Sequence, residues 1–205
     1  MNFLAHAFLA GADPGLRIGG LIGDFVKGPL PAGLPTDLAE GVRLHRRIDV
    51  WAETHPAFRR SRGRVATDRR RFAGILVDMY YDHFLADQWE RRHHLPLAQF
   101  TAETYALAGA RAAELPAGFV RLLPRMRAMD WLASYRRIAA VEEALDRMAT
   151  RLSRPDGLRG GIADLARDYA GFEADFAEFI GDATRMTAEA VAAAGLPDPG
   201  RPPGV

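Results

Sequence analysis

The 205-residue chain contains no cysteine, a single lysine and no long run of apolar residues. The lack of cysteine excludes a disulfide framework, a thiolate zinc site and a cysteine nucleophile. No segment approaches the roughly 20 uninterrupted apolar residues that a membrane-spanning helix requires, so we expect a soluble cytoplasmic protein with no membrane partner. Because 48% of the residues are apolar, a chain of this length can bury a sizeable core without covalent or metal support.

The net charge of +1 hides two oppositely charged segments. Residues 41–71 contain ten arginines against three acids, whereas residues 160–189 contain seven acids against two arginines. The near-neutral balance argues against nucleic acid as a partner, as does the lack of aromatic residues interleaved with the arginines. The arginine-rich stretch is either a solvated surface or a docking site for an acidic protein. The candidate docking residues are Arg59, Arg60, Arg62, Arg64, Arg69 and Arg70.

Apolar residues recur at helical spacing along nearly the whole chain, and the alternating runs typical of strands are absent. Proline and glycine residues divide this pattern into segments. The sequence therefore predicts an all-α fold, a single-domain bundle of about seven helices over residues 1–195, followed by a disordered Pro/Gly-rich tail at 196–205. The expected helices cover residues 2–11, 15–26, 36–53, 66–93, 97–113, 117–148 and 156–194.

Polar residues interrupt the most apolar of these expected helices. His45 and Asp49 are four residues apart and share a helix face, where they either ligate one metal or pair with each other. Asp78 and Asp82 repeat this spacing, and His83 follows directly. A carboxylate on a buried helix must be paired, hydrogen-bonded or bound to a metal, because burying it bare is costly. Residues 78–83 are therefore the strongest functional signal in the chain.

Two further residues stand out in the same way. Asp24 lies near the end of an apolar helix, and His6 interrupts the first one, where a histidine is more often a core residue than a ligand. Imidazole nitrogens and carboxylate oxygens, with no thiolate available, suit Mn²⁺, Mg²⁺ or Fe²⁺, although zinc accepts the same set. Such residues converging from several helices would form a catalytic metal site inside the bundle.

Four motifs in a fixed order resemble the acyl carrier protein phosphodiesterase family, also called the acyl carrier protein hydrolase family. They are MNFLAH at 1–6, GDFVKG at 23–28, HRRID at 45–49 and DMYYDHFL at 78–85, and the resemblance extends over about residues 1–180. It implies a phosphodiesterase that depends on a divalent metal, preferably Mn²⁺, and removes the 4′-phosphopantetheine arm from holo-acyl carrier protein. It also implies a fold similar to the HD-type phosphohydrolases, whose metal is held by His and Asp residues from several helices.

This resemblance assigns roles to the residues singled out above. The expected metal ligands are Asp24, His45, Asp82 and His83, with Asp78 and His6 as further ligands or supporting partners. The expected catalytic residues are Asp82, His83, Arg46 and Arg47, of which an arginine would stabilise charge on the phosphoryl oxygens. The acidic carrier protein would dock at the arginine-rich segment. Two alternatives stay open: a metal phosphohydrolase acting on a nucleotide or small diester, and a non-enzymatic helical interaction domain.

Overall fold

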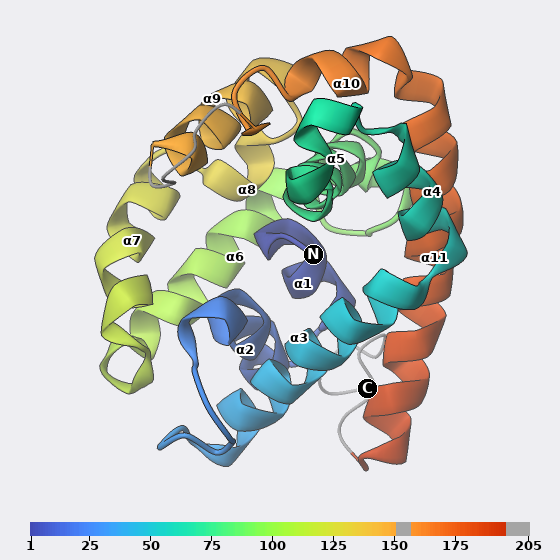
Figure 1. Ribbon diagram of the computed structural model, residues 1–205. Coiled ribbons are helices and arrows are strands. Elements are labelled where there is room, and N and C mark those ends of the chain that lie inside the picture. The colour runs from blue at the N-terminus through green and yellow to red at the C-terminus, as the bar shows by residue number, and fades with distance from the viewer. Residues whose placement is uncertain (151–156, 196–205) are drawn as a thin grey trace.

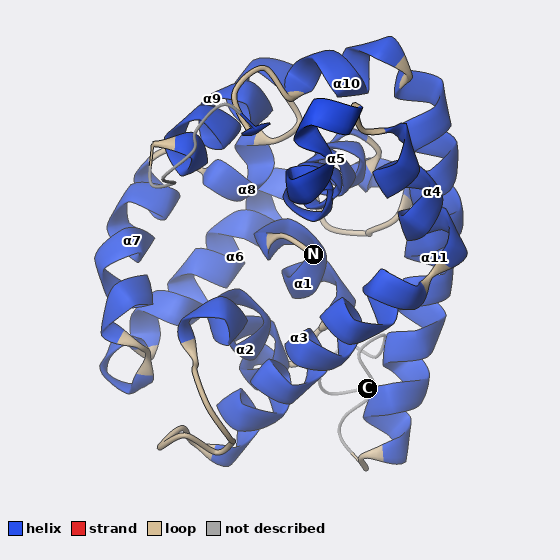
Figure 2. Ribbon diagram, viewed as in Figure 1, coloured by secondary structure: helices blue, strands red, loops and turns tan. Residues whose placement is uncertain are grey.

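A computed structural model describes residues 1–150 and 157–195, and in these two stretches every regular element is a helix (Figures 1 and 2). The all-α prediction is confirmed, while the tail at 196–205 lies outside the described residues. None of the described helices is long and apolar enough to span a membrane. The α-helices are α1 (Phe3–Leu9), α2 (Pro14–Ile22), α3 (Thr36–Thr54), α4 (Pro56–Arg64), α5 (Ala73–Asp87), α6 (Leu97–Ala110), α7 (Ala117–Ala128), α8 (Trp131–Ser134), α9 (Ile138–Ala149), α10 (Ile162–Arg167) and α11 (Tyr169–Ala193). Short 3₁₀ helices join some of them: η1 (Gly23–Phe25), η2 (Thr67–Phe72), η3 (Trp89–Arg91) and η4 (Ala112–Glu114).

The described residues hold eleven α-helices instead of about seven, because long expected helices are broken. The segment 117–148 forms three of them. The break falls at Asp130, which has a left-handed backbone (φ +40°) and whose carboxylate accepts a hydrogen bond from the Ala133 amide to begin α8. Helix α4 occupies a stretch between two expected helices and opens on Pro56, a residue favoured at the first helical position.

Helix α5 forms the centre of the core, and α1, α4, α8, α9 and α11 pack around it (Figure 1). Its large side chains Tyr80, Tyr81 and Phe84 are completely buried. Eleven of its fifteen residues are buried, which agrees with a helix that is apolar over most of its surface. Any charged or polar side chain on α5 must therefore find its partner inside the protein.

Helices α2 and α3 approach each other closely through glycine. A Cβ added to Gly19 would lie 2.4 Å from the Cα of Gly41, and one added to Gly41 would lie 2.7 Å from the carbonyl oxygen of Gly15. Only glycine allows backbones to come so near. The contact holds the middle of α3 against α2, where the side chains of the site described below are found.

We expect Gly19→Ala to destabilise the protein by about 1–3 kcal/mol, because the new methyl group overlaps backbone atoms that cannot rotate away. Urea unfolding followed by circular dichroism measures the change. Gly63→Ala is the matched control, since a Cβ there meets nothing within 4 Å and alanine favours the helix. Equal stability of the two variants would contradict the tight packing of α2 on α3.

Candidate metal centre

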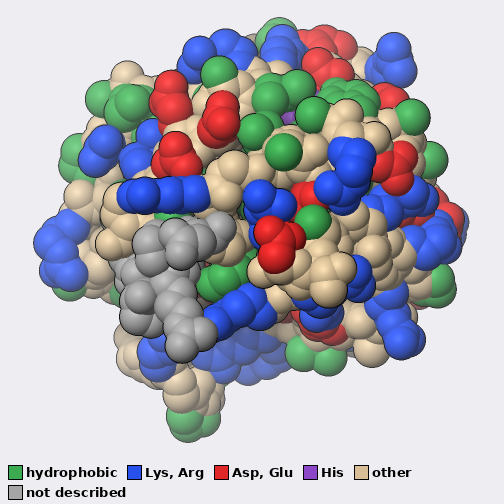
Figure 3. Space-filling model, turned by 45° about the horizontal axis from the view of Figure 1, so that its top comes forward, with side chains coloured by type: hydrophobic (Ala, Val, Ile, Leu, Met, Phe, Trp, Pro, Cys, Tyr) green, Lys and Arg blue, Asp and Glu red, His purple; other side chains and the backbone are tan. Residues whose placement is uncertain are grey.

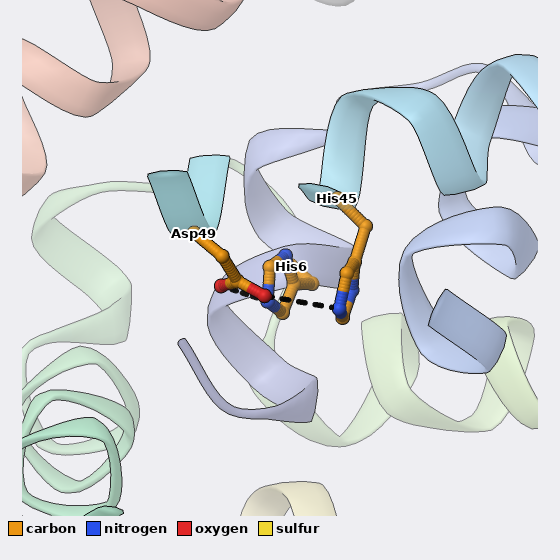
Figure 4. Close-up of side chains that lie close together, drawn as sticks. All are labelled: His6, His45 and Asp49. Carbon is orange, nitrogen blue, oxygen red and sulfur yellow. Dashed lines mark ion pairs between the residues drawn. The ribbon is translucent and has the colours of Figure 1, made fainter. Parts of the chain in front are cut away.

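Three side chains from two helices converge beneath the N-terminus of the chain (Figure 4). The carboxylate of Asp49 faces two imidazoles, with Oδ1 3.2 Å from Nε2 of His6 and Oδ2 3.2 Å from Nε2 of His45. One atom from each residue lies within 4.8 Å of the others, which is close enough for all three to contact a single ion. Helix α1 contributes His6, while α3 contributes both His45 and Asp49, which are one helical turn apart.

The local backbone fixes the orientation of His45. Its Nδ1 lies 2.9 Å from the carbonyl oxygen of Gly20, and because a carbonyl can only accept, Nδ1 is the donor. In the neutral ring this leaves the electron pair on Nε2, the atom that faces Asp49. Gly23 allows the ring this position, since a Cβ there would lie 2.3 Å from Cγ of His45. A histidine held through Nδ1 by a backbone carbonyl is typical of metal ligands.

His6 is fully buried, yet neither of its ring nitrogens forms a hydrogen bond within the described residues. Its ring stacks on that of His45, with centroids 3.7 Å apart. Burial, together with the neighbouring His45, lowers the pKa of His6 to about 3, so the ring is neutral at physiological pH. A buried polar atom without a hydrogen bond needs an explanation, and a divalent cation at this position would supply one.

Asp24 borders the site on its exposed side. It lies on η1, directly after α2, with Oδ1 3.6 Å from Nε2 of His45 and 70% of its side chain exposed. The contact with His45 lowers the pKa of Asp24. Burial by itself lowers the pKa of His45, but Asp24 and Asp49 outweigh that effect and raise it to about 9. His45 therefore carries a proton in the metal-free protein at neutral pH, and a bound cation would displace it.

The amino group of Met1 separates Asp78 from the three converging side chains. This nitrogen lies 2.8 Å from Oδ1 of Asp49 and 3.2 Å from Oδ1 of Asp78. Burial lowers the pKa of the amino group, but the carboxylates of Asp78 and Asp49 outweigh it and raise the pKa to about 10. The structure therefore brings Asp78 to the edge of the site, where its partner is this ammonium group.

The structure does not bring Asp82 and His83 into the site, although the sequence analysis placed both among the ligands and catalytic residues. Asp82 accepts hydrogen bonds from the amides of Leu4 and Ala5, each at 2.9 Å, so both carboxylate oxygens bind the first turn of α1. His83 lies on another face of α5, because adjacent helical residues do not point the same way. Its Nδ1 lies 2.9 Å from the Tyr135 carbonyl and its Nε2 3.0 Å from the Tyr169 hydroxyl. Both residues have structural partners that account for their burial.

Neither of the arginines next to His45 reaches into the site through a hydrogen bond. Arg46 donates from its two terminal nitrogens to the carbonyls of Val26 and Gly28, both at 2.9 Å. Arg46 therefore holds the loop after η1, and its expected role on the phosphoryl oxygens stays a prediction. Arg47 is exposed and forms no ion pair within the described residues.

The arginine-rich segment is largely paired within the molecule. The acidic helix α11 and its N-terminal flank lie along α4, and Arg60 and Arg64 both bind the buried carboxylate of Asp175 at 2.8 Å. Of the other docking candidates, Arg62 pairs with Glu53, and Arg69 lies 3.7 Å from both Asp68 and Asp164. Figure 3 accordingly shows basic and acidic side chains interspersed on the face that it draws. Arg59 and Arg70 are exposed and make no ion pair in the described part of the chain.

Asp49 was considered in the sequence analysis as a partner of His45 but was not placed in the expected ligand set. The structure makes it the residue that the two histidines share. Its spacing of four residues from His45 was the signal that could have found it. The Met1 amino group gave no signal, because a chain terminus has no sequence pattern.

The fold and this site define a helical protein with a histidine and aspartate centre suited to a divalent cation. The chain belongs to the acyl carrier protein phosphodiesterase family, whose profile matches residues 1–183. Its curated relatives include proteins named acyl carrier protein phosphodiesterase from Salmonella dublin, 36% identical over 93% of this chain and 97% of the relative, and from Escherichia coli O157:H7, 34% identical over the same shares. Another, from Enterobacter sp. (strain 638), is 33% identical over 87% of this chain and 93% of its own length. No solved structure matches the chain.

We expect Asp49→Asn to weaken Mn²⁺ binding by more than about 100-fold, because the amide removes the negative charge and one of the two oxygens facing the histidines. Isothermal titration calorimetry of the purified protein measures the affinity. Asp146→Asn, an exposed acid on α9, is the matched control and should bind like the unchanged protein. Retention of full affinity by Asp49→Asn would exclude this site.

Asp82 gives a prediction about stability and pH. Burial raises the pKa of Asp82 to about 7, although the amides of Leu4 and Ala5 act in the opposite direction. Between about pH 4 and 7 the folded protein keeps a proton that the unfolded chain releases. This contribution to stability is complete below pH 4 and is lost as the pH rises through 7.

We therefore expect Asp82 to lower the unfolding free energy of the unchanged protein by on the order of 1–4 kcal/mol as the pH rises from 4 to 7. This decrease should be absent in Asp82→Asn. Urea unfolding in the presence of a chelator, repeated across this range, measures the slope. Asp146→Asn should keep the slope of the unchanged protein. An identical slope in Asp82→Asn would show that Asp82 is ionised throughout.

Proposed function

We propose that this protein hydrolyses the phosphodiester that joins 4′-phosphopantetheine to a serine of holo-acyl carrier protein, releasing apo-carrier protein and 4′-phosphopantetheine. The proposal rests on membership of the acyl carrier protein phosphodiesterase family, whose curated relatives cover nearly the whole chain. The single observation that carries it in the structure is the carboxylate of Asp49, shared by two imidazoles of which one has no hydrogen bond in the described residues.

The proposed cofactor is a divalent ion, with Mn²⁺ favoured and Mg²⁺ or Fe²⁺ as alternatives. His6, His45 and Asp49 would hold it, and Asp24 borders the same position from the solvent side. When bound, such an ion stabilises negative charge on phosphoryl oxygens and makes water a better nucleophile near neutral pH. The donor atoms fit this role because they are nitrogen and oxygen, are close together and include a buried histidine nitrogen that makes no hydrogen bond in the described residues.

The protein prepares this site through its own contacts. The Gly20 carbonyl sets the ring orientation of His45, and burial keeps His6 neutral, so a free electron pair remains on each imidazole once the proton on His45 is displaced. The ammonium group of Met1 balances the charge of Asp49 at Oδ1, the oxygen that also faces His6. Fixed partners of this kind reduce the reorganisation that the reaction requires.

The carrier protein is acidic, so exposed cations near the site would speed its encounter. Lys27 follows Asp24 by three residues, whereas Arg47 lies on α3 on a different face from His45; both are exposed and unpaired within the described residues. Together with Arg59 and Arg70, they are the cations that we propose for docking, in place of the paired arginines of α4. Their effect is on association and weakens with salt.

We expect the purified protein, supplied with Mn²⁺, to convert holo-acyl carrier protein to the apo form with release of 4′-phosphopantetheine. Mass spectrometry of the carrier protein detects the loss of the arm. Asp49→Asn should reduce the rate to background, and Asp146→Asn should leave it unchanged, since only the first residue contacts the histidines.

The same assay distinguishes the proposed function from the two alternatives, a phosphohydrolase acting on a small substrate and a non-enzymatic interaction domain. Cleavage of a small phosphodiester or nucleotide at full rate, with holo-carrier protein left intact, would overturn the proposed substrate and keep the phosphohydrolase class. Failure to bind Mn²⁺ or to cleave either substrate would instead favour a helical interaction domain.

A further inference from the structure

A pocket of about 290 Å³ lies between the loop that follows η1 and the N-terminus of α7. One wall consists of Phe25, Val26 and Lys27, and facing residues include Leu34, Leu115 and Pro116. The volume is close to the lower limit for sites that take small molecules. The lining is mixed, since apolar side chains alternate with backbone and with the charged ends of Lys27 and Glu114.

The pocket begins at the residue that follows Asp24. Lys27 is three positions after Asp24, so their Cα atoms are at most about 11 Å apart. Asp24 is the exposed border of the candidate metal centre. A molecule whose phosphate is at that centre therefore needs only a short extension to enter the pocket.

Ion pairs and hydrogen bonds hold both sides of the pocket in place. Arg46, next to His45 on α3, donates to the carbonyls of Val26 and Gly28 and so fixes the first wall to the helix that carries the ligands. On the other side Arg111 binds Asp37 at the start of α3 and Glu114 on η4. A pocket formed before its ligand arrives loses less conformational entropy on binding.

Aromatic packing holds Phe25, a residue of the pocket wall. Phe25 packs edge to face on Phe119 of α7, with ring centroids 5.5 Å apart, and lies over Phe3 of α1. Gly118 permits this approach, because a Cβ there would lie 3.1 Å from Cδ1 of Phe25. The wall of the pocket is thus in contact with α1, the helix that carries His6.

We propose that this pocket binds the pantetheine arm of the substrate while the phosphodiester lies at the candidate metal centre. This assignment rests on the proposed function. The arm has about thirteen bonds from phosphorus to sulfur and spans roughly 14–15 Å when extended, by analogy with a four-residue peptide. It combines methyl and methylene groups with two amides, which suits apolar side chains beside backbone donors and acceptors. This length exceeds the largest possible Cα separation of Asp24, at the border of the centre, and Lys27, in the pocket wall.

The test uses Leu34→Trp, which fills the pocket from a half-buried position, and Leu30→Trp as its matched control. Leu30 lies in the same loop and is also half-buried, but it does not line the pocket. We expect Leu34→Trp to raise the KM for holo-carrier protein at least tenfold. Mn²⁺ affinity and hydrolysis of bis-p-nitrophenyl phosphate should remain those of the unchanged protein, because neither needs the pocket.

A binding measurement on the unchanged protein makes the test independent of that variant. Pantetheine lacks the phosphate, so its binding reports on the pocket without the metal centre. In an NMR titration we expect saturable shifts of the amides of residues 25–27, 34 and 115, and loss of these shifts in Leu34→Trp. Shifts confined to other residues would overturn the assignment of the pocket. So would a Leu34→Trp variant with the same KM for holo-carrier protein as Leu30→Trp. Neither result would contradict the phosphodiesterase activity. Unchanged protein that leaves holo-carrier protein intact would overturn the proposed function and this assignment together.

Discussion

The carboxylate of Asp82 determines where the first helix lies. It projects from the largely buried helix α5 and accepts hydrogen bonds from the amides of Leu4 and Ala5, which have no partner within their own helix. This contact joins the first turn of α1 to the centre of the core. His6, one residue further along α1, is thereby placed against His45 of α3. The site therefore depends on a residue that does not belong to it.

The two oppositely charged segments of the chain pack against each other in the fold. Arginines of α4 and acids of α11 are more than one hundred residues apart, yet they form the ion pairs on Asp175, which is almost completely buried. A buried carboxylate needs such partners, because an unpaired one would be costly. The surplus of positive charge that suggested a docking surface is thus largely neutralised by ion pairs within the molecule. What remains for a partner is a smaller number of exposed cations, of which Lys27 is three residues from Asp24.

Much of the fold was predictable from periodicity. Apolar residues at helical spacing indicated an all-α protein, and proline and glycine marked many of the breaks. The break at Asp130 could not be found in this way, because it depends on a left-handed backbone and a capping carboxylate at a residue with no strong turn signal around it. Helix α4 was missed because its arginines obscure the short apolar pattern of Ala57 and Phe58.

For the site, the sequence by itself determined which residue types were available: histidine and aspartate without cysteine, spaced to share helix faces and interrupting apolar segments. It also indicated the family, through four motifs in order. Only the tertiary structure decided which of those residues meet. Asp49 and His6 join His45, whereas Asp82 and His83 bind backbone and tyrosine groups elsewhere. The physical reason is that a buried polar residue must have a partner, but its position in the sequence does not say whether that partner is an ion, a helix terminus or another side chain.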